Sequence, residues 1–426
     1  MNIMLPYGKS EITLKIADET SVRILNKELA PPLASVSETL RAAMSNPIGS
    51  PPFHNLFRET DRVVILIPDV TRKAGLRQVL PVLLTELEKL GISRYQVVLL
   101  VALGMHRLMS RDELTSMIGK ETLDRHQVIQ HDCHSIADNA HLGVTERGSP
   151  IVINRLALPP NKVVVVGSIT HHYFSGFGGG AKMLCPGVAG FDSILATHRL
   201  TLDPNSPDYF HTCCKPGILD GNPVREEIER IGEQVPPAFL INTVLSPEGG
   251  IIALFAGHWQ KAFRQGCRYV SRHFEIPIDR RADCVIAAGG GFPKDMNLIQ
   301  SHKGMEYATN ALKPGGSLLY LAECRDGVGS ETFLPWFEAE TCEEMFDNLL
   351  KKYTVNGHTA LSMRRKTLGF NVHICSELSP GTVEKIGAKP AKNPQIWLNY
   401  PRGFIYIIPR SGNFTLKQSG VIDDIM

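Results

Sequence analysis

The stretch 167–190 reads GSITHHYFSGFGGGAKMLCPGVAG, so two adjacent histidines precede a glycine-dense run and Lys182 follows it. Glycines lack a Cβ and let backbone N–H groups approach an anion such as a phosphate. Histidine is suited to proton transfer near neutral pH and to metal binding. The stretch therefore combines glycines that could bind an anion with histidines that could bind a metal or transfer a proton. Lys182 could serve either purpose.

The glycine run is not a P-loop. Ala181 precedes Lys182 and Met183 follows it, so the phosphate-gripping glycine and the magnesium-binding hydroxyl are both missing. Gly176, Gly178 and Ala181 fit the dinucleotide fingerprint G-x-G-x-x-[GA], but the match starts six residues after the preceding apolar run. The acidic residue expected about 20 positions later is also absent. A tight turn between a strand and a helix would explain one or two of these glycines. It explains poorly why four of the five residues 176–180 are glycine.

The elements that position these groups are apolar runs rich in Val, Ile and Leu. Near-continuous apolar runs are typical of strands buried on both faces of a parallel sheet. The predicted strands are 62–69, 96–104, 162–170, 238–246, 283–290, 316–323, 370–378, 395–400 and 403–409. Polar groups follow four of them: Asp69, Thr71 and Arg72; His106 and Arg107; His171 and His172; and Lys294, Asp295, Gln300 and Lys303. Because ligands bind outside the carboxyl ends of such strands, a parallel sheet brings these groups to one rim.

Helical patterns lie between the strands. We predict helices over 76–91 and over 110–119 with Ser110 as N-cap, and a helix that Asp192 caps and that carries His198. The alternation predicts an α/β fold of two domains with mainly parallel sheets flanked by helices, and an active site in the cleft between them. The N-terminal domain, 1–275, would bind the cofactor and carry catalysis, and the smaller domain, 276–426, would contribute substrate-binding residues.

Composition narrows the class of protein. The 426 residues are 43% apolar and 21% charged, with a net charge of +2, which argues against a nucleic-acid or polybasic membrane surface. Nine cysteines without a CxxC pair fit a reducing cytoplasm. No apolar run reaches the roughly 18 residues of a membrane helix, and the N-terminal residues do not resemble a signal peptide.

Each candidate residue also has a purely structural interpretation. Arg72 could form an ion pair with Asp69, and His106 could be a satisfied half-buried histidine. Lys303 could be a solvated lysine on a helix. His198 could be a core histidine, although it could also be a metal ligand. The cluster His131, Cys133 and His134 has a spacing that could bind zinc, but without further ligands we expect a surface cluster. The functional interpretation depends on the joint placement of these residues.

Four motifs resemble the lactate racemase family, whose members use a nickel-pincer nucleotide. They are D-x-T-R from Asp69 to Arg72, G-x-H-R ending at Arg107, H-[FY]-F-x-G-F-x-G-G-x-K from His172 to Lys182, and Q-x-x-K from Gln300 to Lys303. The third motif is long and specific, and a helical histidine follows it. The resemblance covers most of the chain and implies an isomerase, a 2-hydroxy-acid racemase or epimerase.

The resemblance also implies a cofactor and its ligands. The cofactor would be a pyridinium bis-thiocarboxylate mononucleotide that holds Ni, joined covalently to Lys182, with His198 in the fourth nickel position, a chemically sensible donor set. The phosphate would lie against Ser175, Gly176, Gly178, Gly179 and Gly180, with Asp69 and Thr71 at the ribose and phosphate edge. Enzymes that make the cofactor are implied as partners in trans.

The implied reaction inverts C2 by proton-coupled hydride transfer to the nickel-pincer nucleotide through a planar 2-oxo acid. His106 and His172 would be the acid–base pair on opposite faces of the substrate, and His171 remains unassigned. Arg72, Gln300 and Lys303 would bind the carboxylate. Lactate-specific members have an aromatic residue where this chain has Ile299, so the substrate side chain and the oligomeric state stay open.

Three alternatives remain at this point. An NAD-dependent 2-hydroxy-acid dehydrogenase would use the glycine run as a dinucleotide turn. A non-catalytic binder of an organic anion would leave the histidines structural. A zinc hydrolase would depend on His131 and His134.

Overall fold

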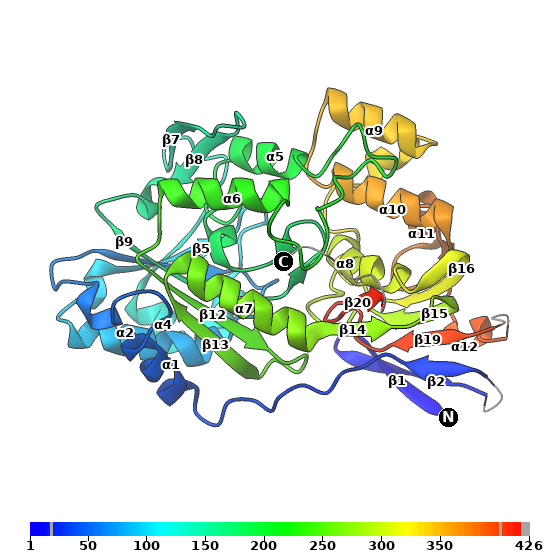
Figure 1. The fold of residues 1–426 in the computed structure, drawn as a ribbon, viewed down its shortest axis with the longest axis horizontal. Coiled ribbons are helices and arrows are strands. Elements are labelled where there is room, and N and C mark those ends of the chain that lie inside the picture. Colours follow the sequence, from blue (N-terminus) through cyan, green and yellow to red (C-terminus); the bar gives the residue numbers. More distant parts are fainter. Residues whose placement is uncertain (18–19, 400–402, 419–426) are drawn as a thin grey trace. The chain divides into compact units, whose positions relative to one another are not determined.

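The computed structural model describes residues 1–17, 20–399 and 403–418, and it divides into two compact units. We call Leu29–Arg272 the central unit. We call the other the split unit, because it combines Met1–Glu28 with His273–Met426. Both units contain a mainly parallel sheet and flanking helices, which confirms the predicted α/β class (Figure 1).

The central unit is built on a six-stranded sheet in the order β13-β12-β9-β4-β5-β6. Every neighbouring pair is parallel except β12 with β13. All six residues of β4 are buried, as expected of a strand covered on both faces. The strands are β4 (Val63–Pro68), β5 (Val97–Ala102), β6 (Gln127–Gln130), β9 (Lys162–Ser168), β12 (Phe239–Leu245) and β13 (Ile251–Gly257).

Three helices share one hydrophobic core with alternate residues of β4 and β5. They are α1 (Val36–Ser45), α2 (Leu76–Lys89) and α3 (Arg111–Ile118). The start of α3 is as predicted: the Ser110 hydroxyl accepts from the Glu113 amide while the Glu113 carboxylate accepts from the Ser110 amide. The same unit contains α4 (Lys120–Arg125), α5 (Phe191–Arg199), α6 (Pro223–Gln234), α7 (Trp259–Phe274), and the two-stranded β7 (Asn139–Val144) with β8 (Pro150–Asn154).

The split unit has its own six-stranded sheet, in the order β18-β17-β16-β15-β19-β3, and all its pairs are parallel. Its strands are β3 (Val22–Ile24), β15 (Ala282–Ala288), β16 (Leu312–Leu321), β17 (Asn371–Cys375), β18 (Lys389–Pro390) and β19 (Ile405–Ile408). Two smaller pairs are β1 (Asn2–Tyr7) with β2 (Ser10–Lys15) and β14 (Glu275–Ile278) with β20 (Thr415–Gln418). The helices are α8 (Leu298–Thr309), α9 (Cys342–Lys351), α10 (Gly357–Gly369), α11 (Pro380–Lys385) and α12 (Pro394–Trp397).

The first 28 residues belong to the split unit, whereas the sequence interpretation assigned 1–275 to one domain. The reason is pairing and packing that the local sequence does not reveal: β3 is the edge strand beside β19, and the β1–β2 hairpin buries Leu5 and Leu14 against the β15–β16 sheet. Figure 1 shows the blue β1 and β2 beside the orange-red β19 and α12. The later unit boundary, at Arg272, lies close to the predicted one at 275.

Two local predictions were wrong. Residues 395–400 were expected to be a strand, but the described part forms α12, because the Asn393 carboxamide accepts from the Gln395 amide and Pro394 occupies the first turn; Tyr400 lies outside the described residues. Asp192 is not the N-cap of α5. Gly190 holds that position, and Asp192 lies in the first turn, where a carboxylate favours the helix dipole.

Within the described ranges, no helix has the length and apolar character needed to cross a membrane.

Leu5 and Met4 lie on opposite faces of β1 and give a matched test of its packing. Leu5 is fully buried and Met4 is 63% exposed. We expect Leu5→Ala to lower the free energy of unfolding by about 2–5 kcal/mol, because it leaves a cavity in the split unit's core. Met4→Ala should change it by less than about 0.5 kcal/mol. Urea unfolding followed by tryptophan fluorescence measures both, since Trp397 belongs to the same core; equal effects would contradict the packing.

Candidate active site

Three predicted site residues follow adjacent strands of the central sheet. Asp69 follows β4, His106 lies four residues beyond β5, and His172 lies four beyond β9. The strands are parallel neighbours in the order β9-β4-β5, in registers that pair Pro68 with Ala102 and Leu66 with Val165. Their carboxyl ends therefore lie at one edge of the sheet. This confirms the predicted convergence for these three segments. The prediction was wrong for the fourth group, Lys294 to Lys303, which follows β15 in the separate sheet of the split unit.

Asp69 and His106 form a direct pair. The Asp69 carboxylate contacts His106 Nδ1 through Oδ2 and accepts from the Thr71 amide at 2.9 Å and the Thr71 hydroxyl at 2.6 Å through Oδ1. Asp69 is 3% exposed, whereas the His106 side chain is 42% exposed. Burial alone would raise the pKa of Asp69, but His106, Thr71 and the charge of Arg72 outweigh it and lower the pKa to about 2. An ionised, buried Asp69 thus orients an accessible imidazole.

The histidine pair starts a short hairpin. His171 and His172 form β10, which pairs antiparallel with β11 (Gly176–Phe177). Both histidines are buried, at 8% and 5% exposed, and the ring of His171 stacks on Phe177 with centroids 5.0 Å apart. The His172 ring lies edge-on to Phe174, and its Nδ1 lies 3.4 Å from the Ser175 amide. The hairpin thus gives the two rings different neighbours.

Close packing within the protein accounts for most of the glycine run. Gly176, Gly179 and Gly180 have positive φ angles of 72°, 79° and 60°. A Cβ on Gly176 would collide with the Ile218 backbone, one on Gly179 would lie 2.7 Å from the Ser168 carbonyl oxygen, and one on Gly180 2.7 Å from the Phe263 ring. Three of the four glycines thus have a packing reason, which is a different cause from the tight turn considered in the sequence.

Lys182 lies beside two of the predicted cofactor residues. It is in the 3₁₀ helix η4 (Gly180–Met183), and its Nζ donates to the Ser175 hydroxyl at 2.9 Å. The same ammonium lies 5.3 Å from the centroid of the Phe174 ring, and that ring is edge-on to His198 at 5.3 Å. Phe174, to which the sequence analysis assigned no role, thus contacts both Lys182 and His198.

His198 is held as a neutral imidazole with a defined tautomer. Its Nδ1–H donates to the Ile194 carbonyl at 2.9 Å, so the ring's lone pair lies on Nε2. Burial first, and the positive charge of Lys182 second, lower the pKa of His198 to about 4. A metal-binding histidine needs this form, because only the neutral ring has a lone pair to share.

Gln300 and Lys303 belong to the split unit, at the start of α8. The Asn297 carboxamide caps this helix by accepting from the Gln300 amide at 2.9 Å. The Lys303 ammonium donates to the Gln300 side-chain oxygen at 2.6 Å, as spacing by one helical turn allows. Both side chains are partly buried. The motif therefore presents a lysine and an amide together.

The histidine cluster after residue 130 is structural. His131 is 1% exposed, and its two ring nitrogens lie 2.9 Å from the Ala189 carbonyl oxygen and 3.1 Å from the Asn154 side-chain nitrogen. The expectation of a surface cluster was therefore wrong for His131. Both of its ring nitrogens have protein partners, so neither is left to bind zinc. Among the residues that the structure describes, no group of three or more His, Cys, Asp or Glu is arranged to hold a metal ion.

Asn242 is a contact residue of the glycine run that the sequence analysis missed. It is fully buried in β12, and its side-chain oxygen accepts from the Gly180 amide at 3.1 Å. A single amide side chain inside the apolar run 238–246 is the signal that could have drawn attention to it, since a buried polar side chain requires partners.

The lowered pKa of Asp69 predicts a pH dependence of stability. Since its pKa falls from 3.8 to about 2 on folding, the ionised form stabilises the folded protein above pH of about 4. This contribution, about 2 kcal/mol, disappears as the pH falls towards about 2. Urea unfolding across this range should show a steeper loss for the unmodified protein than for Asp69→Asn. The exposed Asp112→Asn serves as control; identical profiles for all three would contradict the pairing.

Comparisons with known proteins agree with these motifs. Residues 7–208 match the lactate racemase N-terminal domain family, and residues 278–362 match the lactate racemase C-terminal domain family. A lactate racemase from Thermoanaerobacterium thermosaccharolyticum is 33% identical over 354 residues, which are 82% of this chain and 81% of that protein. A lactate racemase from Lactiplantibacillus plantarum is 32% identical over 334 residues, 78% of this chain and 77% of that protein.

Solved structures give the same result. The lactate racemase apoprotein from Thermoanaerobacterium thermosaccharolyticum superimposes with a TM-score of 0.86 at 29% identity, covering 98% of this chain and 100% of that chain. A protein from Thermotoga maritima shares the fold, with a TM-score of 0.68 at 18% identity, covering 92% of this chain and 100% of that one. The first domain family spans the Asp69, His172 and Lys182 motifs, and the second spans Gln300 and Lys303. This chain is an isomerase that belongs to the lactate racemase family.

Proposed function

We propose that this protein is a racemase or epimerase that inverts C2 of a 2-hydroxy acid with a nickel-pincer nucleotide as cofactor. The observation that supports it most directly is the neutral His198, whose lone pair lies on Nε2, with Lys182 close enough to lower its pKa. An imidazole able to bind a metal and an amine near enough to affect its pKa support a metal-bearing cofactor attached through a lysine.

The donor set of the central unit fits this cofactor. His198 would coordinate nickel, an ion that accepts imidazole together with sulfur ligands. Lys182 would form the covalent link to one arm of the cofactor, and Ser175 lies within hydrogen-bond distance of its amine. The phosphate role of Ser175, Gly176 and Gly178–Gly180, and the ribose-edge role of Thr71, come from the family motif alone.

The chain's own residues would move protons at the substrate hydroxyl. When bound, the cofactor supplies a hydride acceptor, so the C2 hydrogen does not have to leave as a proton. His106, oriented by Asp69, takes the hydroxyl proton of one enantiomer, and His172 donates a proton to the oxygen when the other enantiomer forms. In the reverse direction the two histidines exchange roles. Asp69 therefore has a positioning role towards His106 in addition to the cofactor role that its motif implies.

Basic side chains would bind the substrate carboxylate. Arg72 has a planar guanidinium that suits a carboxylate, and Lys303 has an ammonium that donates to the Gln300 amide oxygen. Ile299 stands in the place of the lactate-type aromatic residue, so the proposal leaves the side chain of the 2-hydroxy acid open. All nine cysteines are free thiols, in keeping with the cytoplasm, where we expect the cofactor-making enzymes to act in trans.

The alternatives do not fit. The glycine run continues from the hairpin into the four-residue η4 and not from a strand into an α-helix, so it is not a dinucleotide-binding turn. Membership of an isomerase family contradicts a non-catalytic binder. The hydrogen bonds of His131 contradict a zinc site.

Nickel analysis combined with an enantiomer screen tests the proposal. Protein co-produced with cofactor-making enzymes should contain about one nickel per chain and interconvert the enantiomers of at least one 2-hydroxy acid. His198→Ala should lose both the nickel and the activity, because the fourth ligand is gone. His54→Ala changes an exposed histidine outside the site motifs, so this variant should keep both the nickel and the activity. Co-produced protein without nickel or turnover would refute the proposal.

The two-histidine arrangement makes a separate prediction. His106→Gln and His172→Gln should each lower kcat by about 10²–10⁴-fold in both directions, because inversion of either enantiomer uses both proton carriers. Initial rates from each pure enantiomer, with nickel content held equal, measure this. If His171→Gln abolishes turnover while His172→Gln retains it, the role belongs to His171.

A further inference from the structure

The first turn of α6 lies against the loop that carries the candidate cofactor residues. Two of its side chains, Asn222 at the N-cap and Arg225 one turn later, are completely buried. Neither belongs to the motifs that the family resemblance identifies. Both direct their donors at backbone carbonyls of the segment 174–177.

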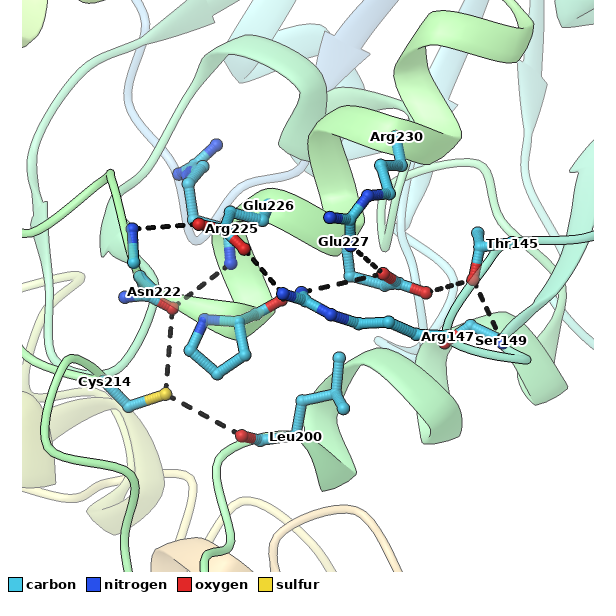
Figure 2. Close-up of polar contacts among 12 residues, drawn as sticks. Thr145, Arg147, Ser149, Leu200, Cys214, Asn222, Arg225, Glu226, Glu227 and Arg230 are labelled. Atoms are coloured by element: carbon cyan, nitrogen blue, oxygen red, sulfur yellow. Dashed lines mark hydrogen bonds and ion pairs between the residues drawn. The ribbon is translucent and has the colours of Figure 1, made fainter.

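Asn222 joins the start of the helix to this segment. Its side-chain oxygen accepts from the Arg225 amide at 3.2 Å, which caps α6 (Figure 2). Its side-chain nitrogen donates to the Phe174 carbonyl at 2.9 Å and to the Ile218 carbonyl at 3.2 Å. One residue thus starts the helix and holds Phe174.

Arg225 holds the next part of the segment. Its Nε donates to the Ser175 carbonyl at 3.2 Å, and its Nη2 donates to the Phe177 carbonyl. The guanidinium lies over the Phe263 ring at 4.8 Å, and the same ring packs against Gly180. The planar fork of arginine can donate to two carbonyls in fixed directions, which a lysine ammonium cannot reproduce.

Two of these carbonyls, those of Phe174 and Ser175, belong to residues that contact the candidate cofactor ligands. The Phe174 ring lies against both Lys182 and His198, and the Ser175 hydroxyl accepts from Lys182. A shift of either backbone carbonyl would therefore move a contact of Lys182. Since groups that bind a reactive centre must be held to about half an ångström, this connection bears on function.

A buried guanidinium stabilises a hydrophobic core less than an apolar side chain of similar volume often does. Taking its charge out of water is costly, and apolar side chains of similar volume often stabilise a protein equally well or better. Burial accordingly lowers the pKa of Arg225, with Glu229 the main opposing charge. What an apolar side chain cannot supply is donors for the Ser175 and Phe177 carbonyls.

Other charged residues of α6 serve a different contact. Glu226 pairs with Arg147, and Glu227 pairs with Arg230 and accepts from the Thr145 hydroxyl. Figure 2 shows Glu227 directed towards the Thr145–Ser149 turn, whereas Glu226 lies nearer to Asn222 and also accepts from the Gly221 amide. Arg230 lies on the same helix, is likewise an arginine and does not contact the loop, so it is a matched control for Arg225.

We propose that Asn222 and Arg225 are positioning residues, which hold the loop 174–177 so that Lys182, Phe174 and His198 stay in register for the cofactor. The inference rests on the proposed function only in taking this loop as the cofactor loop. The claim that α6 orders the loop can be tested in the full-length apoprotein without any cofactor.

Amide hydrogen exchange over residues 171–183 of the apoprotein is the first test. We expect Arg225→Met to speed exchange there by about tenfold or more, because it removes hydrogen bonds from a charged donor. Arg225→Lys should have a smaller effect, and Arg230→Met should leave exchange in this segment unchanged. Asn222→Ser keeps a capping hydroxyl but loses the donor to Phe174, so it should also speed exchange.

If Arg225→Met does not fold, Arg225→Lys and Asn222→Ser decide the result. Exchange at the unmodified rate in both would overturn the proposal.

Kinetics of the co-produced holoprotein are the second test. At equal nickel content, Arg225→Lys should lower kcat by about tenfold while KM for the hydroxy acid changes by less than about threefold, since the substrate ligands are elsewhere. In the protein as purified, before rates are normalised to nickel, the amount of cofactor retained on Lys182 per chain, measured by intact mass, should also be lower. An active unmodified enzyme with unchanged kcat and adduct in the variant overturns this inference alone. An unmodified protein that neither binds nickel nor turns over refutes the proposed function instead.

Discussion

The parallel pairing of β4 with β5 on one side and β9 on the other is the constraint on which the candidate site depends. Parallel strands all end at the same edge of a sheet, so Asp69, His106 and His172 converge although more than a hundred residues separate the first from the last. Packing on both buried faces of these strands fixes the register, because a slip by one residue would move every side chain to the opposite face, where it would meet different neighbours. The chemistry can then lie on loops, whose positions the sheet determines.

Burial has opposite outcomes at the two best-defined ionisable groups of the central unit. Asp69 is buried with a histidine, a hydroxyl and a nearby arginine, so its charge is compensated and it stays ionised. His198 is half-buried beside a lysine, so desolvation and the lysine charge both disfavour its protonated form and it stays neutral. The first arrangement suits a carboxylate that orients a base, and the second a ring that shares its lone pair. Both follow from which charges the fold places nearby, and neither requires unusual residue types.

Much of this could be predicted from the sequence where the signal is local. Eight of the nine predicted strands and the N-cap at Ser110 are local patterns, and they are confirmed. Three kinds of feature could not be predicted this way. The pairing of β3 with β19 depends on distant partners, the packing around Gly176 and Gly180 depends on Ile218 and Phe263, and the helix at Pro394 depends on one capping side chain overriding an apolar run. The Asp69–His106 contact belongs with them, since the sequence indicates only that the two residues end neighbouring strands.

The division of the split unit also bears on the order in which the chain becomes structured. Lys15 and Gln395, which hydrogen-bond each other through backbone and side chain, are 380 positions apart, with the whole central unit between them. During synthesis the central unit is complete and able to fold while the first 28 residues still lack their partners. In the folded protein the apolar face of the β1–β2 hairpin, with Leu5 and Leu14, packs against strands that are synthesised only after the central unit. We therefore expect the ribosome-bound intermediate to have one folded unit and one exposed hairpin, the species most in need of protection by a chaperone.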